Sequence, residues 1–257
     1  MKSIDEIFRK PGVVLGTWVS LTDPTVIELA KMAGFDFVRV DNEYIPFDYD
    51  MMAQFIRTAN NIGMPIIIRV SRLEDITMLI SAGADGIMIP DGSYERAKAA
   101  IEYLKYAPLG NRSINSGSRA VRTSGLEFQE YYQQANNHVC LVVQIESQKG
   151  MDEIDMILSL DGVDFVASGR SDISQALGVP GETKHPKVDA FENRVIEKSL
   201  EHHKIPMVFI ASSKMLLESN ELPQEELLQK GVNVIVVDQD YQYMLNGMQA
   251  AVQKMRG

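Results

Sequence analysis

Short apolar runs alternate with longer amphipathic stretches along all 257 residues of the chain. Several of the short runs, such as Pro65–Val70, are apolar almost without interruption and rich in β-branched residues. Strands that are covered on both faces show this pattern, and they belong to parallel sheets. The eight candidate strands are Val13–Ser20, Phe35–Asn42, Pro65–Val70, Gly86–Asp91, Val139–Ser147, Val163–Gly169, Pro206–Ser212 and Val232–Asp240.

Stretches with helical periodicity separate these candidate strands. Three strands follow the dipeptides Ala33-Gly34, Ala82-Gly83 and Lys230-Gly231, in which glycine supplies the left-handed conformation that ends a helix. The expected helices are Pro24–Ala33, Asp50–Asn61, Leu73–Ala82, Tyr94–Tyr106, Gly150–Leu160, Asp189–His203, Lys214–Lys230 and Tyr241–Met255.

Eight strands that each precede a helix favour a closed barrel over an open doubly wound sheet. Neither a Gly-x-Gly-x-x-Gly sequence after the first strand nor a Walker-type loop is present, so the signatures of nucleotide-binding folds are missing. The length suits a (β/α)8 barrel, which typically needs about 250 residues. We therefore predict an α/β fold, a TIM barrel of eight parallel strands, as a single domain over residues 1–257.

The charge balance excludes one large class of partner. The formal net charge of −10 argues against nucleic acid, whose binding depends on basic residues that neutralise phosphates. No apolar run reaches the ~20 residues of a membrane helix, and the N-terminus does not resemble a signal peptide. With Cys140 as its one cysteine, the chain cannot form an internal disulfide. We expect a cytoplasmic protein that binds neither nucleic acid nor membrane.

Two connections are long enough to predict a functional role. Ala107–Leu126 is the one extended loop and contains Arg112, Arg119 and Arg122, which would border the pocket and bind an acidic substrate tail. Surface solvation is the other interpretation and is preferred for Arg119 and Arg122, whereas Arg112 is the candidate for the pocket. The second connection, Val179–Val188, follows a short helix after the sixth strand.

Catalytic side chains of β/α barrels lie at the C-terminal ends of the strands. None of the four histidines is found at a strand end, and zinc-binding motifs are missing from the sequence. The residues at or just after the strand ends are Trp18, Ser20, Asp41, Glu43, Tyr44, Arg69, Asp91, Gln144, Glu146, Ser168, Arg170, Asp172, Ser212, Ser213, Asp238 and Asp240.

Glu146 and Asp172 come from neighbouring strands at matching heights. Two carboxylates, together with waters and a bidentate substrate, would complete an octahedral oxygen site for Mg²⁺ or Mn²⁺. The alternative for Asp172 is that it caps the following helix, as acidic residues do at helix N-termini. Glu146 lies in an apolar run, where a carboxylate needs a partner.

Arg69 ends an apolar run and would place a guanidinium at the barrel mouth, where it suits a carboxylate or a developing enolate. The alternative is an internal salt bridge to Asp41 or Glu43. The segment Gly169–Asp172 opens a helix, so its backbone N–H groups would hold a substrate carboxylate.

Several stretches of the chain together resemble one known family, the class II, metal-dependent 2-oxo acid aldolases of the HpcH/HpaI type. The resemblance extends from Leu15 to about Asp240 and rests on the order and spacing of the stretches. They are Gly16-Thr-Trp-Val-Ser, Asp36-Phe-Val-Arg-Val-Asp-Asn-Glu, Pro65-Ile-Ile-Ile-Arg-Val, Ala82-Gly-Ala-Asp-Gly-Ile-Met-Ile-Pro, Tyr106-Ala-Pro-Leu-Gly-Asn-Arg, Val143-Gln-Ile-Glu-Ser and Gly169-Arg-Ser-Asp-Ile-Ser-Gln-Ala-Leu-Gly.

The resemblance implies a β/α barrel, usually a homohexamer, whose last helix is exchanged between subunits. It also implies a divalent metal ion (Mg²⁺, Mn²⁺ or Co²⁺) that binds pyruvate or a longer 2-oxo acid through its keto and carboxylate oxygens. By position, Glu146 and Asp172 match the metal ligands, and Arg69 matches the arginine that stabilises the pyruvate enolate. Trp18 and Gln144 match residues that line the site, and the amides near Gly169 and Ser171 match the carboxylate cradle.

One departure from the family pattern affects the expected mechanism. The family usually has histidine where this chain has Tyr44, and often an acidic residue where this chain has Ser81, as the partner of that histidine. Aldol cleavage needs a base for the C4 hydroxyl proton. An unperturbed tyrosine is ionised to about one part in a thousand at pH 7, a handicap of about 4 kcal/mol. Arg69 and a metal ion near the tyrosine would lower its pKa and so reduce this handicap. A metal-bound hydroxide is a further candidate base. The alternative is that Tyr44 only fills and lines the pocket.

We therefore expect a metal-dependent carbon–carbon lyase, an aldolase that acts on 2-oxo acids through the pyruvate enolate. Decarboxylation of oxaloacetate yields the same enolate without removal of a hydroxyl proton, so an oxaloacetate-type decarboxylase is the first alternative. A carbon–carbon bond-forming relative and a non-catalytic 2-oxo acid binding protein are the others.

Overall fold

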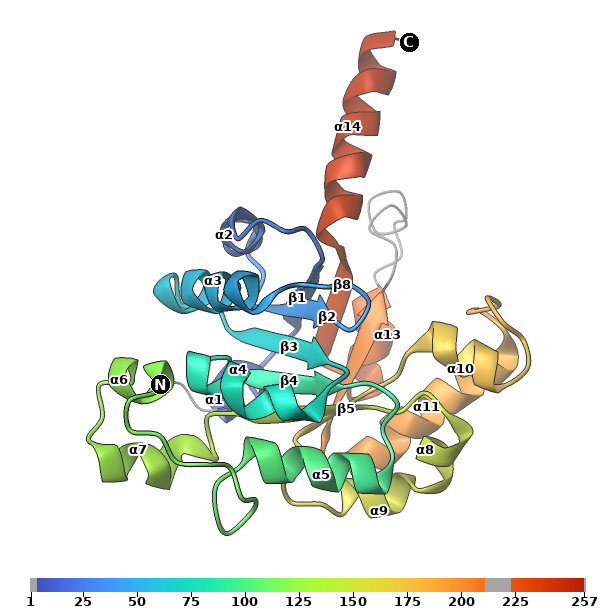
Figure 1. Ribbon diagram of the computed structural model, residues 1–257. Coiled ribbons are helices and arrows are strands. Elements are labelled where there is room, and N and C mark those ends of the chain that lie inside the picture. The colour runs from blue at the N-terminus through green and yellow to red at the C-terminus, as the bar shows by residue number, and fades with distance from the viewer. Residues whose placement is uncertain (1–3, 211–222, 257) are drawn as a thin grey trace.

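The eight strands close into a barrel in chain order, with β8 beside β1 (Figure 1). The computed structural model describes residues 4–210 and 223–256. All neighbouring strands run parallel, for example with Asp41 opposite Arg69 across β2 and β3. The predicted TIM barrel is confirmed. The strands are β1 Val14–Val19, β2 Phe37–Asn42, β3 Ile66–Val70, β4 Gly86–Ile89, β5 Cys140–Gln144, β6 Phe165–Ala167, β7 Ile205–Ile210 and β8 Val234–Gln239.

Helices surround the barrel and return the chain from the C-terminal to the N-terminal end of the strands. The helical pattern at Gly150–Leu160 forms two short helices, α8 and α9, and that at Leu73–Ala82 begins as a 3-10 turn. The helices are α1 Ile4–Phe8, α2 Thr25–Ala33, α3 Tyr49–Asn61, η1 Leu73–Asp75, α4 Ile76–Ala82, α5 Tyr94–Leu104, α6 Arg119–Thr123, α7 Phe128–Ala135, α8 Gln148–Asp152, α9 Ile154–Leu158, α10 Arg170–Ala176, α11 Pro186–Glu201, α13 Pro223–Gln229 and α14 Asp240–Arg256.

The connection Ala107–Leu126 is not the structureless loop that was expected, because it contains α6 and leads directly into α7. Helices α6 and α7 are only five and eight residues long, so their helical pattern is too short to be recognised in the sequence. The candidate strand-end residues Ser212 and Ser213, and the first part of the expected helix Lys214–Lys230, lie outside the described residues.

Aromatic side chains fill the N-terminal end of the barrel. Phe8 of α1 contacts the rings of Phe37 and Phe165 edge-on, at centroid distances of 5.2 and 4.8 Å. Gly16 makes room for this packing, since a Cβ atom there would lie 2.3 Å from the Phe37 ring. The closed end leaves the opposite, C-terminal end as the place for a pocket.

An aspartate recurs just before three of the even-numbered strands and ties each of them to the preceding odd strand. Asp36, Asp85 and Asp164 each follow a Gly-x dipeptide, and each carboxylate accepts a hydrogen bond of 2.9 Å from a backbone N–H of the neighbouring strand. Before β8 the corresponding residue is Asn233, whose side chain donates to the Phe8 carbonyl at 3.2 Å. The N-terminal end of the barrel is therefore held by a hydrogen-bond pattern that repeats every two strands.

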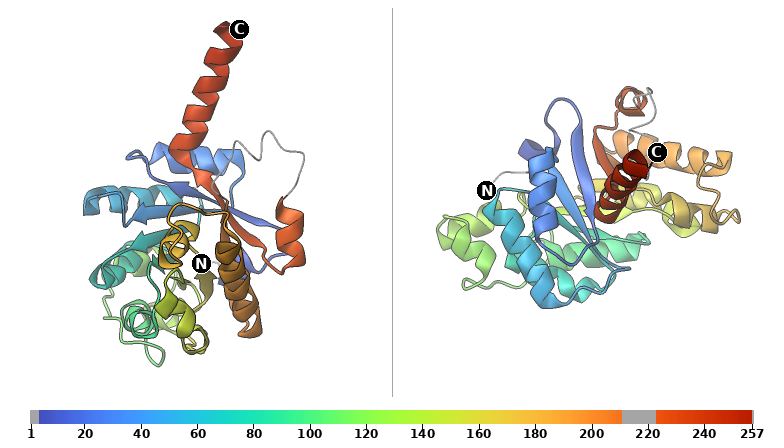
Figure 2. Two further views of the ribbon diagram at one scale, coloured as in Figure 1. Left: turned by 90° about the vertical axis from the view of Figure 1, so that its right-hand side faces the viewer. Right: turned by 90° about the horizontal axis from the view of Figure 1, so that it is seen from above.

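Helix α14 extends away from the barrel (Figures 1 and 2). Within the described ranges, no helix has the length and apolar character needed to cross a membrane.

We expect Asp85→Asn to gain stability over the parent protein as the pH rises. Burial raises the pKa of Asp85 to about 6, whereas an unfolded chain has an aspartate pKa near ~4. The ionised form is therefore disfavoured on folding, and the loss of stability grows as the pH rises through this window. Asparagine keeps an oxygen for the Ile66 N–H and does not ionise. Urea unfolding at pH 5 and pH 8 measures the difference.

Two variants serve as controls. Asp85→Ala removes the acceptor for Ile66 and should lower the free energy of unfolding by about 1–3 kcal/mol. Asp36→Asn removes the same type of hydrogen-bonded carboxylate, but one that also pairs with Lys10, so it should lose stability at both pH values. Equal behaviour of the Asp85→Asn and Asp36→Asn variants at both pH values would contradict the raised pKa.

Candidate active site

A cavity of about 990 Å³ opens at the C-terminal ends of the strands. Seven of the eight residues predicted for the site line it, namely Trp18, Tyr44, Arg69, Gln144, Gly169, Ser171 and Asp172. The eighth, Glu146, contacts Gln144. Residues from five different strands and the loops after them thus meet in one pocket.

Glu146 lies two residues beyond the end of β5 and is only 6 % exposed. Its Oε1 accepts a hydrogen bond of 2.9 Å from the backbone N–H of Asp91, and its Oε2 accepts one from the side-chain amide of Gln144. Asp91 has a φ of 46°, a left-handed conformation for a non-glycine residue. Burial, with the charges of Asp172 and Glu43, raises the pKa of Glu146 to about 7, against the lowering effects of the Asp91 hydrogen bond and Arg69. The buried carboxylate has the partners that its position requires, yet lacks a neutralising charge of its own.

Gly169 is needed for close approach. A Cβ atom at this position would lie 2.2 Å from Glu146 Oε2 and 2.4 Å from Gln144 Nε2. Because its φ is −107°, the backbone itself would accept another residue. The side chains of Glu146 and Gln144, not the backbone, therefore require glycine here.

Asp172 lies in the first turn of α10 and faces the same cavity. Among the described residues, no backbone N–H of α10 donates to its carboxylate and the N-cap is Gly169, although an acidic residue in the first turn suits the helix N-terminus. Its negative charge raises the pKa of Glu146, Glu43 and Tyr44. Asp172 and Glu146 are therefore electrostatic neighbours, as their positions in the sequence predicted.

The charges of the cavity suit a divalent cation. Asp41, Glu43 and Glu146 interact with the guanidinium groups of Arg39 and Arg69, and Asp172 interacts with Glu43 and Glu146. With all four carboxylates ionised, they would exceed the two cations by two negative charges. Among the described residues, no group of three His, Cys, Asp or Glu side chains is arranged to hold a metal ion. A cation here would have two protein ligands, and its other ligands would be waters and substrate oxygens.

Arg69 is held by both acidic residues that were its possible ion-pair partners. Its Nε and NH2 donate to the two carboxylate oxygens of Asp41 at 2.9 and 2.6 Å, and its NH1 lies 2.9 Å from Glu43 Oε2. Arg69 also lines the cavity. The internal salt bridge and the position at the pocket are thus both present, and the pairing fixes the orientation of the guanidinium group.

Tyr44 is 65 % exposed, and the Arg69 guanidinium lies 5.0 Å from the centre of its ring. Partial burial raises the pKa of Tyr44, and the charges of Glu43 and Asp172 raise it further, against the smaller effect of Arg69. The expected lowering by Arg69 therefore does not prevail among the protein's own groups. Ser81, near the C-terminus of α4, lies at the opposite end of the barrel, so positions 44 and 81 are not partners within one subunit.

The two long connections behave differently. Thr183 and Lys184 of Val179–Val188 line the cavity, and Arg170 holds this segment by donating to the Thr183 carbonyl from Nε and NH2 at 2.9 and 2.7 Å. The connection Ala107–Leu126 lies at the other end of the barrel, where Arg119 donates to the Ala82 carbonyl at the end of α4. None of its three arginines lines the cavity, so the prediction that Arg112 borders the pocket is wrong.

Arg112 is buried against the ring of Tyr106 and donates to Ser81 Oγ at 3.3 Å. Its guanidinium group therefore lies at the N-terminal end of the barrel strands, away from the cavity. Sequence spacing alone does not indicate which end of the barrel this connection covers.

Arg39 on β2 is one of the cavity residues that were not predicted from the sequence. It is 1 % exposed, and its guanidinium lies 3.8 Å from the centre of the Trp18 ring. A signal for it is present in the sequence. Phe37 and Asp41 alternate with apolar neighbours along β2, and this period of two places Arg39 on the inner face as well.

Comparison with known proteins decides the family. A model of the HpcH/HpaI aldolase/citrate lyase family matches residues 15–221. The chain belongs to this family. The 2-keto-3-deoxy-L-rhamnonate aldolase of Escherichia coli strain K12 is 33 % identical over 199 residues, which cover 76 % of this chain and 72 % of that protein.

Solved structures agree on the fold. An HpcH/HpaI aldolase from Desulfitobacterium hafniense DCB-2 superimposes with a TM-score of 0.89 at 24 % identity, over 100 % of this chain and 97 % of that one. The citrate lyase beta subunit from M. tuberculosis, solved with oxaloacetate and magnesium, has a TM-score of 0.54 at 13 % identity and covers 90 % and 94 % of the two chains. The predicted family and the predicted class of enzyme, an aldolase or lyase, are confirmed.

We expect Gly169→Ala to lower the free energy of unfolding by about 1–3 kcal/mol, because the added Cβ overlaps the side chains of Glu146 and Gln144. In a Glu146→Ala background the same substitution should cost less, since one of the two overlapping groups is gone. Urea unfolding of the four proteins in chelator gives the coupling energy, expected to exceed about 0.5 kcal/mol. Strictly additive losses would show that the glycine serves another purpose.

Proposed function

We propose that this chain cleaves carbon–carbon bonds of 2-oxo acids with the help of a divalent cation held by Glu146 and Asp172. The observation that carries this proposal is the cavity with two excess negative charges, in which these carboxylates are electrostatic neighbours. Membership of the HpcH/HpaI aldolase/citrate lyase family supports it. When bound, the cation would polarise the keto group and balance the negative charge of the substrate.

Arg69 would stabilise the charge that develops on the keto oxygen. Two of its five N–H groups donate to Asp41, and Glu43 lies 2.9 Å from NH1 without accepting a hydrogen bond, so three N–H groups remain for a substrate oxygen. A guanidinium already held by two carboxylates needs little reorganisation when the charge appears. Trp18 and Gln144 would line the substrate, and the backbone N–H groups near Gly169 and Ser171 would bind its carboxylate.

Tyr44 makes decarboxylation of oxaloacetate the reaction that this site supports better than aldol cleavage. In decarboxylation the C3–C4 bond breaks, CO₂ leaves, the electron pair stays on the three-carbon enolate, and C3 then takes a proton from solvent. No protein base is needed. Aldol cleavage requires removal of the C4 hydroxyl proton, and the raised pKa of Tyr44 makes it a poor base at neutral pH.

We expect pyruvate release from oxaloacetate to exceed release from 4-hydroxy-2-oxo acids, with Mg²⁺, Mn²⁺ or Co²⁺ and above the rate without enzyme. EDTA should abolish both activities, and Glu146→Gln should lose the metal-dependent part of both. Tyr44→His introduces a group with a pKa near ~6.5 and should raise aldol cleavage about 10-fold or more. Coupled detection of pyruvate measures all of these rates.

Tyr44→Phe is the matched control for the tyrosine hydroxyl. If it abolishes a robust aldol cleavage, tyrosine acts as the base and the preference for decarboxylation is wrong. Metal-dependent binding of pyruvate without any turnover would instead favour a non-catalytic binding protein.

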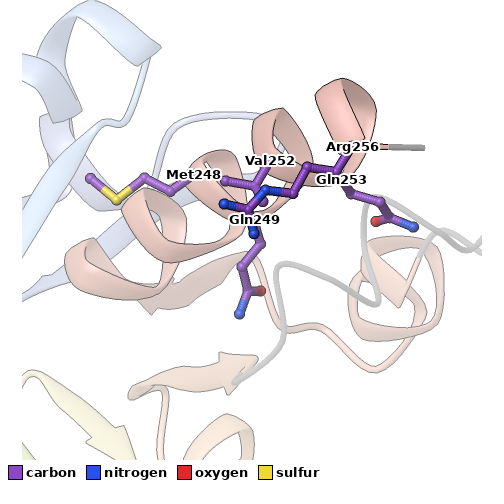
Figure 3. Close-up of a pocket in the computed structure, with 5 residues that line it drawn as sticks. All are labelled: Met248, Gln249, Val252, Gln253 and Arg256. Carbon is purple, nitrogen blue, oxygen red and sulfur yellow. The ribbon is translucent and has the colours of Figure 1, made fainter.

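We propose further that the protein is a homo-oligomer in which α14 packs on another subunit, with the hexamer usual for the family as the expected size. A stripe of exposed apolar residues along α14 supports this, since such a surface commonly marks an interface. Figure 3 shows the pocket of about 410 Å³ on this helix, lined by Met248, Gln249, Val252, Gln253 and Arg256. The exposed apolar residues are Tyr241, Met244, Leu245, Met248, Val252 and Met255.

Removal of residues 240–257 should reduce the oligomer to smaller species, and so should the double substitution Met248→Lys, Val252→Lys. Light scattering after size exclusion measures the mass. Ala250→Lys adds a charge to an exposed position two residues away, on the other side of the helix, and should leave the mass unchanged. A monomeric full-length chain would contradict the proposal.

A further inference from the structure

Arg39 has hydrogen-bond donors inside the barrel that no described protein group accepts. Its Nε and NH2 are buried and without a partner among the described residues, and its NH1 contacts only the sulfur of Met88, at 3.3 Å. The guanidinium group lies against the Trp18 ring and 5.1 Å from the centre of the Phe209 ring. A cation so placed has lost its hydration and has gained, among the described residues, one weak hydrogen bond to a sulfur atom.

Arg69, which lies closer to the mouth of the barrel, shows what the Nε and NH2 atoms of an arginine bind at this site. Its Nε and NH2 bind both oxygens of Asp41, the side-on geometry that arginine offers to a carboxylate. Arg39 presents the corresponding pair of donors, lines the same cavity, and makes no salt bridge with any described residue. Burial lowers its pKa, and the charge of Arg69 lowers it further, to about 9, so the group stays mainly protonated at neutral pH.

Two other residues that line the cavity also have buried polar atoms without a described partner. These atoms are Trp18 Nε1 and Gln144 Oε1. Buried polar groups in folded proteins are nearly always satisfied. Three side chains with open hydrogen-bonding positions at the floor of one cavity therefore indicate that a ligand completes them.

The barrel geometry separates this floor from the start of α10. Arg39 is on β2, and Gly169 follows β6, so the two lie four strands apart in a closed ring of eight, on opposite walls. The interior of such a barrel is only wide enough for side chains or one small molecule. A ligand with an anionic group at each end would reach both walls, whereas a monocarboxylate would leave one wall without its partner.

We propose that Arg39 binds the second carboxylate of a dicarboxylic 2-oxo acid through its Nε and NH2, and so selects four- and five-carbon dicarboxylates over monocarboxylates. This inference rests on the proposed function, which assigns the first carboxylate to the start of α10. It narrows the substrate class of the site and gives Arg39 a task distinct from that of Arg69.

Calorimetric titration of the metal-loaded protein tests the proposal with matched ligands. 2-Oxoglutarate and 2-oxopentanoate have the same five-carbon 2-oxo acid chain and differ only in the terminal carboxylate. Oxaloacetate and 2-oxobutyrate are the four-carbon pair, with the oxaloacetate arm read as KM. We expect the parent protein to prefer at least one dicarboxylate, and Arg39→Met to reduce that preference by about 10- to 100-fold.

Lys184→Met is the control for net charge, because Lys184 is an exposed residue at the rim of the same cavity. It should keep the preference for the dicarboxylate. Arg39→Lys keeps the charge but loses the paired donors, and should lose most of the preference. If Arg39→Met does not fold, as judged by thermal unfolding, the Arg39→Lys variant carries the test.

Equal Kd values for the two ligands of each pair in the parent protein would overturn the proposal. So would a preference that survives in the Arg39 variants, or one that Lys184→Met removes equally. Failure of the proposed function is a different result, since then none of the four 2-oxo acids would bind in a metal-dependent way.

Discussion

The closure of eight parallel strands is the constraint on which the rest of the structure depends. Closure sends every second side chain of each strand into one narrow interior, so residues far apart in the sequence face each other across it. Phe37, Arg39 and Asp41 show the consequence along a single strand. Phe37 packs against Phe8 at the N-terminal end of the barrel. Arg39 reaches the floor of the cavity, and Asp41 orients Arg69 at its mouth.

Electrostatics at the mouth follows from the same closure. Carboxylates from β2, β5 and the start of α10 are brought into one partly desolvated space, where the charge of Asp172 raises the pKa of Glu43 and Glu146. Arg69 compensates for the two nearest to it, and the remaining excess negative charge favours a cation. The residues of the site thus act as one coupled set, and a substitution at any of them changes the pKa values of the others.

The strands could be predicted from the sequence because short apolar runs rich in β-branched residues alternate with amphipathic stretches, which is the pattern of parallel strands covered on both faces. The positions of Trp18, Arg69, Gln144 and Asp172 around one cavity were also predictable, since strand ends of a β/α barrel converge. Arg112 was assigned to the wrong end of the barrel, because sequence spacing does not show which end its connection covers, and the two helices that follow it were too short to be recognised. Arg39 was missed because it lies in the middle of β2 and not at its end, although a charged residue at an inward position of an apolar strand was itself a signal.

The aspartates at positions 36, 85 and 164 bind neighbouring strands together at the end of the barrel away from the cavity. Each one fastens a pair of strands without help from any residue of the cavity. The mouth is thereby free to diverge in evolution, and an exchange of histidine for tyrosine at position 44 would leave the scaffold intact. Substitutions that change the substrate would then accumulate at the cavity without unfolding the barrel.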